Sequence, residues 1–171
     1  MEKFISSDDV VYKVYNTNNP GMIFSWGKLD VDATGFGYDL MRHSKAFFCA
    51  SSELIGLYDE GNDLRFSRYY DKYDFNNYDE GIFYVATKNY CKASTANEAY
   101  DQALRLEEAY LNRAEAYIEK GEYELGMDDV NAIRAERIKG EYELVANSVD
   151  EAREFYRLEK RLEFSFEFLT G

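Results

Sequence analysis

The sequence predicts a mainly α-helical fold, with antiparallel helix pairs preceded by short strands and loops. Three observations lead to this prediction. From Ser94 onward the chain contains no proline, alanine is frequent, and apolar residues recur at helical spacing. Two glycines, Gly121 and Gly126, lie between and within two of the expected helices. The first 93 residues instead combine β-branched and aromatic runs with turn residues.

The first segment, residues 1–26, is expected to be extended. It contains DVVYKVY, in which β-branched and aromatic residues disfavour a helix. The segment TNNPG at 17–21 holds the only proline and predicts a turn, and MIFSW at 22–26 is a second short apolar run. The glycine-rich segment 27–39 that follows indicates a loop.

A short helix is expected to begin at Ser51 or Ser52 and to continue through ELIGLYD. After it, residues 64–90 are rich in tyrosine and phenylalanine. This segment is interpreted as a hairpin or meander with NNYDEG as its turn.

The longest helix is expected from Asn97 to Lys120, because polar residues suitable for a cap precede apolar residues at helical spacing. Gly121 follows as a C-terminal stop. Two adjacent apolar stripes indicate that the helix is covered on more than one side. They contain Leu106, Tyr110 and Tyr117 in the first stripe, and Leu104, Leu111, Ala114 and Ile118 in the second.

The next helix is expected to place Tyr123, Met127, Val130 and Ile133 on one face. Gly126 inside this helix costs about 1 kcal/mol relative to alanine. We expect close approach of the preceding helix at Ala114 to compensate for that cost, because two backbones come together only where side chains are small. The short connection between the helices forces them to be antiparallel.

A third helix is expected to begin at Ser148, which has capping-box spacing to Glu151. Apolar residues then recur at helical spacing, at Phe155, Leu158, Leu162, Phe166 and Leu169.

Three arginines on this helix, Arg153, Arg157 and Arg161, recur every four residues. Like charges at this spacing repel one another when nothing answers them. We therefore expect some of them to pair with acidic residues on neighbouring helices, and a solvated face is the alternative.

The charge of the chain excludes several classes of partner. There are 20 basic and 33 acidic residues, giving a formal net charge of −13. Nucleic acid is not an expected partner, because phosphate recognition requires clustered Lys and Arg. No catalytic residue, metal site or cofactor is expected, and Cys49 and Cys91 lack metal-binding spacing. These cysteines are expected either to form a disulfide or to stay free.

The helical hairpin resembles a tetratricopeptide unit. Ala114, Tyr117 and Gly121 have the spacing of the small residue, aromatic residue and glycine of that pattern, and Gly126 takes the small position of the second helix. A single unit of this kind is not stable alone, so further units are expected elsewhere.

A narrower resemblance covers most of the chain. LRLEEAYLNRAEAYIEKGEYELGMDDVNAIRAERI (104–138) resembles the repeat segment of SusD/RagB-type proteins, which are glycan-binding outer-membrane lipoproteins. Three further segments resemble the same family and occur in its order. They are SSELIGLYDEGNDLRF with its Asp63 and Arg65, TKNY, and LEKRLEFSFE (158–167).

Compared with the family, the chain shows no counterpart of the long N-terminal half, the signal peptide or the lipid-bearing cysteine. We therefore expect it to be the C-terminal part of a longer protein. Residues 1–93 are expected to be loop- and strand-rich with one short helix, and residues 94–171 to form the helical repeat segment. Together they are expected to be part of one SusD-like domain.

The resemblance implies a protein that is not an enzyme. It implies capture of oligosaccharides at the cell surface and delivery to a SusC-like TonB-dependent transporter in the outer membrane. A lipid anchor outside this chain would hold the protein at the membrane. The alternative function is a soluble tetratricopeptide-like scaffold that binds another protein and no sugar.

Aromatic residues make up 17% of the chain and suggest where a sugar binds. Sugar rings stack on aromatic planes while nearby polar groups bind their hydroxyls. The first candidate segment contains Trp26, Phe36 and Tyr38 among glycines and aspartates, and the second contains Tyr70 and Tyr73 beside aspartates and asparagines. The alternatives are a loop packed on the scaffold for the first segment and a tyrosine-rich hairpin edge for the second.

Overall fold

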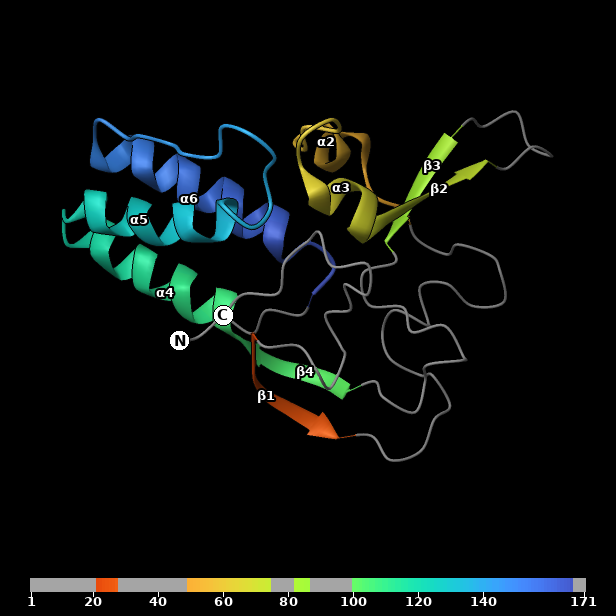
Figure 1. Ribbon diagram of the computed structural model, residues 1–171, viewed down its shortest axis with the longest axis horizontal. Helices are drawn as coiled ribbons and strands as arrows, with labels where there is room; N and C mark the ends of the chain where they lie inside the picture. Colours follow the sequence, from red (N-terminus) through yellow and green to blue (C-terminus); the bar gives the residue numbers. More distant parts are fainter. Residues whose placement is uncertain (1–20, 28–48, 75–81, 87–99, 168–171) are drawn as a thin grey trace.

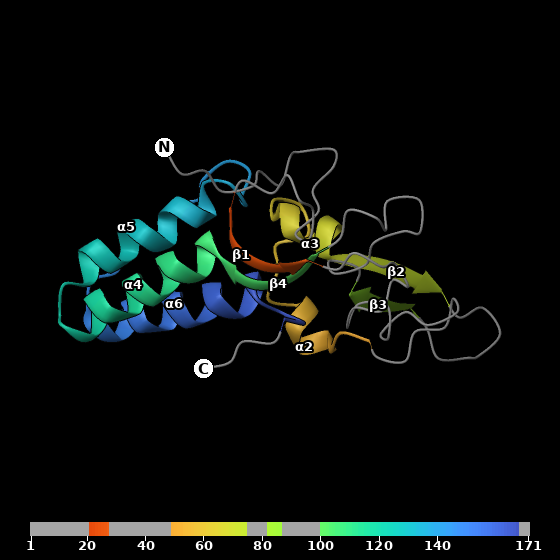
Figure 2. The same cartoon turned by 90° about the horizontal axis from the view of Figure 1, so that it is seen from below.

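Three helices form the main body of the computed structural model, which describes residues 21–27, 49–74, 82–86 and 100–167. They are α4 (Leu106–Glu119), α5 (Tyr123–Arg134) and α6 (Val149–Glu163). All three pack against one another and lie side by side in Figures 1 and 2. The prediction of a mainly α-helical fold is confirmed.

The apolar faces of these helices meet in one core. Its members are Leu111, Ala114 and Ile118 of α4, Met127, Val130 and Ile133 of α5, Ala152 and Tyr156 of α6, and Phe164. These residues of the expected faces of α4 and α5 therefore point inward, while the expected Tyr110, Tyr117 and Tyr123 are only partly buried. On α6 the buried side is different, because Phe155 and Leu158 are only partly buried while Glu159 and Glu163 are fully buried.

The two predicted glycines lie where the sequence places them. Gly121 has a φ of +85°, a left-handed conformation that glycine adopts without strain, and it follows the last turn of α4. A Cβ atom on Gly126 would lie 2.8 Å from the Ala114 carbonyl oxygen and 2.6 Å from Cγ1 of Ile118. The predicted close approach of the two helices at Ala114 is confirmed.

The start of α6 is also as expected. The Ser148 hydroxyl accepts a hydrogen bond from the backbone N–H of Glu151 at 3.2 Å. The Glu151 carboxylate accepts from the backbone N–H of Asn147 at 2.7 Å, one residue before the cap. Together these two hydrogen bonds cap the first turn of α6 in the manner of a capping box.

Two short helices precede this body. The first, α2 (Ser52–Ile55), is capped by Ser51 and confirms the start of the expected short helix, although it ends at Ile55 and does not continue through Asp59. The second, α3 (Leu64–Tyr69), was not expected, and the hairpin interpretation of these six residues is wrong. The Asp63 carboxylate accepts from the backbone N–H of Arg65 at 3.0 Å, so a helix N-cap overrides the strand preference of the aromatic residues.

The strands form two separate antiparallel pairs. β2 (Tyr70–Asp74) pairs with β3 (Ile82–Ala86), which confirms a hairpin in that part of the chain. The predicted NNYDEG turn lies outside the described residues. β1 (Met22–Gly27) pairs with β4 (Tyr100–Arg105). We refer to these pairs as the β2–β3 ribbon and the β1–β4 ribbon.

The strand β4 corrects the sequence prediction. A helix was expected from Asn97, but residues 100–105 are extended and α4 begins only at Leu106. The physical reason is tertiary: β1 supplies backbone partners from a segment far away in the sequence, and the Leu106 N–H donates to the Gly21 carbonyl at 2.7 Å. Such pairing outweighs the local preference for helix.

Both ribbons lie beyond the same end of the three-helix body in the two views of Figures 1 and 2. Within the described ranges, no helix combines the length and the apolar character needed to cross a membrane.

Candidate functional site

The predicted carbohydrate-binding residues are distributed over both ribbons. Trp26 lies on β1 opposite Asp101, and Tyr73 lies on β2 opposite Phe83. Phe36 and Tyr38 lie outside the described residues. The ribbons therefore bring three of the five candidates, Trp26, Tyr70 and Tyr73, to the same end of the molecule, while their role in binding stays a prediction.

The fifth candidate, Tyr70, lies in a second core. Its side chain is only 4% exposed, and its hydroxyl donates to the Ser165 hydroxyl at 2.8 Å. The rings of Tyr58 and Phe166 meet it edge-on, with centroid distances of 5.5 and 6.1 Å. This placement favours a packing role for Tyr70, because neighbouring rings cover the surface on which a sugar would stack.

Tyr58 joins this second core to the end of α6. Its hydroxyl donates to the Leu162 carbonyl at 2.8 Å. Burial is the main reason that the pKa of Tyr58 and the pKa of Tyr70 are raised above the ordinary value for a phenol.

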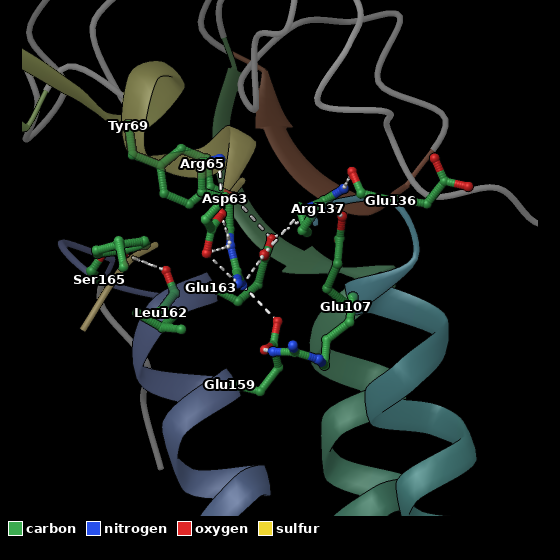
Figure 3. Close-up of polar contacts among 12 residues, drawn as sticks. Asp63, Arg65, Tyr69, Glu107, Glu136, Arg137, Glu159, Leu162, Glu163 and Ser165 are labelled. Carbon is green, nitrogen blue, oxygen red and sulfur yellow. Dashed lines mark hydrogen bonds and ion pairs between the residues drawn. The ribbon is translucent and has the colours of Figure 1, made fainter. Parts of the chain in front are cut away.

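Between the two cores lies a cluster of charged side chains, drawn in part in Figure 3. All of its members are at most 4% exposed. We call it the buried ion network, and its members are Asp63, Arg65, Arg105, Glu107, Arg137, Glu159 and Glu163.

Arg65 on α3 connects the first half of the chain to α6. Its Nε and Nη2 donate to Asp63 at 2.9 and 2.8 Å, and its Nη1 donates to Glu159 at 2.6 Å. Burial alone lowers the pKa of the Arg65 guanidinium, but the surrounding carboxylates raise this pKa well above its ordinary value. Arg65 is therefore a permanent positive charge inside the protein.

Glu163, the last residue of α6, accepts hydrogen bonds from several elements. Its Oε1 accepts from Arg105 Nη1 at 2.9 Å and from the Tyr69 hydroxyl at 3.1 Å. Its Oε2 accepts from Arg137 Nε at 3.1 Å. Figure 3 shows the Glu163 carboxylate between Arg65 and Arg137.

Arg137 and Arg105 complete the network through Glu107. Arg137 donates to Glu107 Oε1 at 2.8 Å, and Glu107 Oε2 lies 3.3 Å from Arg105 Nη1. In this arrangement Glu107 Oε2 and Arg105 Nε make no hydrogen bond. The carboxylates of Glu167, Glu107 and Glu163 hold the pKa of Arg105 well above its ordinary value, although burial works in the opposite direction.

Backbone hydrogen bonds reinforce the network beside α3. The Leu64 N–H donates to the Arg137 carbonyl, and the Lys139 N–H donates to the Asn62 carbonyl, both at 2.9 Å. The segment after α5 is thereby joined to the segment before α3.

The network is built for cohesion. Each of its carboxylates is occupied by at least one arginine in the interior. Removing one partner from such a cluster leaves an uncompensated buried charge, which costs about 3–5 kcal/mol. Among the residues that the structure describes, no group of His, Cys, Asp and Glu side chains is arranged to hold a metal ion.

The arginine prediction for α6 is confirmed at two positions. Arg153 donates to Glu119 of α4 at 2.7 and 2.9 Å, and Arg161 donates to Glu53 of α2 at 3.0 Å. These pairs are at the surface, where the contribution of an ion pair to stability is small.

Sequence reasoning identified Asp63 and Arg65 only as part of a motif and missed the rest of the network. Glu159 and Glu163 alternate with arginine and lysine in LEKRLE, which is also the pattern of a solvated helix face. Their spacing of four residues, in register with the buried Ala152 and Tyr156, was the available signal.

Comparison with known proteins identifies the family. A model of the SusD family matches residues 11–169. The chain belongs to the SusD family. No match to it was found among curated protein sequences.

The fold agrees with this family. A crystal structure of a SusD-like protein from Bacteroides fragilis matches with a TM-score of 0.63 and 22% sequence identity. The match covers 89% of this chain and 42% of that one, so the chain spans less than half the length of the SusD-like protein.

The buried ion network coincides with the segments that resemble SusD-type proteins. Asp63 and Arg65 come from SSELIGLYDEGNDLRF, and Glu159 and Glu163 come from LEKRLEFSFE. The remaining members, Arg105, Glu107 and Arg137, come from the repeat segment. Segments separated in this SusD-family sequence are therefore joined in space by their charged residues.

Proposed function

We propose that the protein binds oligosaccharides at the cell surface and delivers them to a SusC-like TonB-dependent transporter of the outer membrane. Membership of the SusD family carries this proposal, since the family model matches nearly the whole chain. The proposed role is nutrient binding without catalysis, at the surface-exposed side of the outer membrane. A lipid anchor would provide the attachment.

The helical body serves as scaffold in this proposal. The close contact of α4 and α5 at Gly126 is what a tetratricopeptide-like hairpin requires. We propose that this hairpin is one unit of a longer stack, because a single unit buries too little apolar surface to be stable alone.

The sugar site is proposed on the ribbon side of the molecule. Trp26 on β1 and Tyr73 on β2 supply aromatic rings, with Phe36 and Tyr38 as further candidates in the neighbouring sequence. Aspartates beside Tyr73, such as Asp71, supply acceptors for sugar hydroxyls. The exposed position of Asp71 on β2 suits this role.

A glycan array followed by calorimetry tests the proposal. The purified protein is applied to the array, and the affinity of the best glycan is then measured for the parent, for Trp26→Ala and for Phe24→Ala. Phe24 lies on the same strand and is 49% exposed, which makes it a matched aromatic control. We expect Trp26→Ala to weaken binding at least about tenfold, equivalent to about 1.4 kcal/mol, and Phe24→Ala to leave it near the parent value.

The two functional hypotheses differ in this experiment. Equal affinities of the parent and Trp26→Ala would remove Trp26 from the site. Binding of another protein, together with no glycan binding by the longer protein that we expect to contain this chain, would favour the protein-binding scaffold instead.

A further inference from the structure

One residue at the base of each ribbon donates a hydrogen bond to the same carboxylate oxygen. Arg105 is the last residue of β4, and Tyr69 is the residue directly before β2. Both donate to Oε1 of Glu163, Arg105 Nη1 at 2.9 Å and the Tyr69 hydroxyl at 3.1 Å. One atom on α6 therefore contacts the base of each ribbon.

Strand pairing does not determine how these ribbons lie relative to each other. Within the described residues, β1–β4 and β2–β3 are separate two-stranded sheets without a ladder between them. Contacts at their bases contribute to their relative position, and Glu163 is bonded to both.

The position of the Glu163 carboxylate is itself fixed. It is fully buried, and Arg137 donates to Oε2 at 3.1 Å and to Oε1 at 3.4 Å. Arg65 Nη1 adds a contact to Oε2 at 3.4 Å. In Figure 3 this carboxylate lies among Arg65, Tyr69 and Arg137.

We propose that Glu163 is a positioning residue that holds the β1–β4 ribbon and the β2–β3 ribbon in one fixed relation, so that an oligosaccharide can contact both. This inference rests on the proposed sugar-binding function. It adds that the site spans the two ribbons, which carry the Trp26 and Tyr73 positions. It also adds that the geometry of the site depends on a carboxylate in the interior.

The substitution Glu163→Gln tests the positioning role while keeping the size of the side chain. An amide retains one oxygen, but its NH₂ group is a donor and now faces guanidinium groups that are also donors. The amide therefore cannot accept from Arg105 and Tyr69 on one side and from Arg137 and Arg65 on the other. The bases of the two ribbons lose their common acceptor or their common charge.

The distance between the ribbons is the direct readout. Spin labels are placed on the 171-residue chain at Ile23 of β1 and Lys72 of β2, both of which are exposed. Cys49 and Cys91 are replaced by serine so that only these positions are labelled. The distribution of label distances is recorded by pulsed electron paramagnetic resonance for the parent, for Glu163→Gln and for Glu119→Gln, which breaks a surface pair with Arg153.

We expect a narrow distribution in the parent and in Glu119→Gln, and a broadened or shifted one in Glu163→Gln at unchanged helical circular dichroism. A distribution that stays the same in Glu163→Gln would overturn the proposal. If Glu163→Gln loses its helical signal, Tyr69→Phe decides: it removes the phenol that contacts Glu163 from the β2 side and keeps the ring. Broadening in Tyr69→Phe supports the proposal, and an unchanged distribution overturns it.

Sugar affinity is a separate readout. We expect Glu163→Gln to lower the affinity for the glycan identified on the array about tenfold. The reason is that the side chains of a binding site tolerate only small displacements. The distance measurement contains no sugar, so failure of the sugar-binding function and failure of the positioning role give different results.

Discussion

Gly126 occupies the tightest contact between α4 and α5. The space for a Cβ atom is taken by the Ala114 carbonyl oxygen at 2.8 Å and by Ile118 Cγ1 at 2.6 Å. Ala114 and Ile118 are themselves buried, at 0% and 1% exposure, so neither neighbour can move into solvent. A backbone atom in particular has no alternative rotamer.

We predict that Gly126→Ala destabilises the protein, although alanine is the better helix former. Inserting a methyl group into a packed contact costs about 1–3 kcal/mol. Replacing glycine by alanine in a helix gains no more than about 1 kcal/mol, so the cost outweighs the gain. Urea unfolding followed by circular dichroism measures the difference. Gly61→Ala is the control, because its Cβ would meet only Asp59 Oδ1 at an ordinary 3.5 Å. Equal stability of Gly126→Ala and the parent would contradict this prediction, because it would mean that α4 and α5 accommodate the added methyl group at no cost in free energy.

The type of a residue does not by itself predict whether its side chain is buried. Glu159 and Glu163 look like surface residues by composition, yet both are fully buried because Arg65, Arg137 and Arg105 come to them from other elements. A lone glutamate in that position would not stay ionised, since burying an unpaired charge is prohibitive. Partners distant in sequence decide where these side chains lie.

At the scale of elements, helix ends are set locally and strands are set at a distance. Ser148 caps α6 and Asp63 caps α3 with side chains that lie next to the helices in sequence. β4, in contrast, exists because β1 lies alongside it. The same contrast explains why the start of α6 agrees with the prediction and the start of α4 does not.

We predict that Ser148→Ala lowers the free energy of unfolding by about 1 kcal/mol, because the first turn of α6 loses the acceptor for the Glu151 N–H. Ser148→Asp restores an acceptor at the same position and should return the stability to near the parent value. Thermal or urea unfolding of the three proteins measures the effect. Loss of stability in Ser148→Asp equal to that in Ser148→Ala would contradict the capping role.

At the scale of the whole molecule, two apolar cores flank the buried ion network. The helical core contains Leu111 and Val130, and the second core contains Tyr58, Phe66 and Tyr70. The network links them through α3 and α6. The described parts of both halves of the chain are therefore held together by apolar packing and by charge.

The buried tyrosines of the second core limit the stability of the folded protein at alkaline pH. Burial raises the pKa of Tyr58 and Tyr70, so the folded state favours the neutral phenols. In the unfolded chain these tyrosines would ionise near pH 10. Their stabilising contribution to the folded state is therefore complete below about pH 10 and is lost as the pH rises further. We predict cooperative loss of helical signal above that pH, together with late ionisation of the buried tyrosines.

Absorbance of ionised tyrosine and circular dichroism, recorded in one alkaline titration, check this prediction. The exposed tyrosines should ionise first, while the helices remain intact. A titration in which all 16 tyrosines ionise near pH 10 without loss of helix would contradict the buried placement of Tyr58 and Tyr70.

The sequence by itself determined the three long helices, the break at Gly121, the close contact at Gly126 and the cap at Ser148. These features depend on residues that are neighbours along the chain or across a short connection, so periodicity and capping chemistry are sufficient to predict them. The family also followed from such local segments, and the comparison with the SusD family confirms it.

Only the tertiary structure decided that residues 100–105 form a strand, that Tyr70 is buried, and that Arg65, Arg105 and Arg137 meet Glu163 in the interior. The physical reason is that a hydrogen-bond ladder or a buried charge is stable only with a partner, and here the partners are up to 98 residues away. A sequence shows the donors and acceptors, and the fold determines which of them meet.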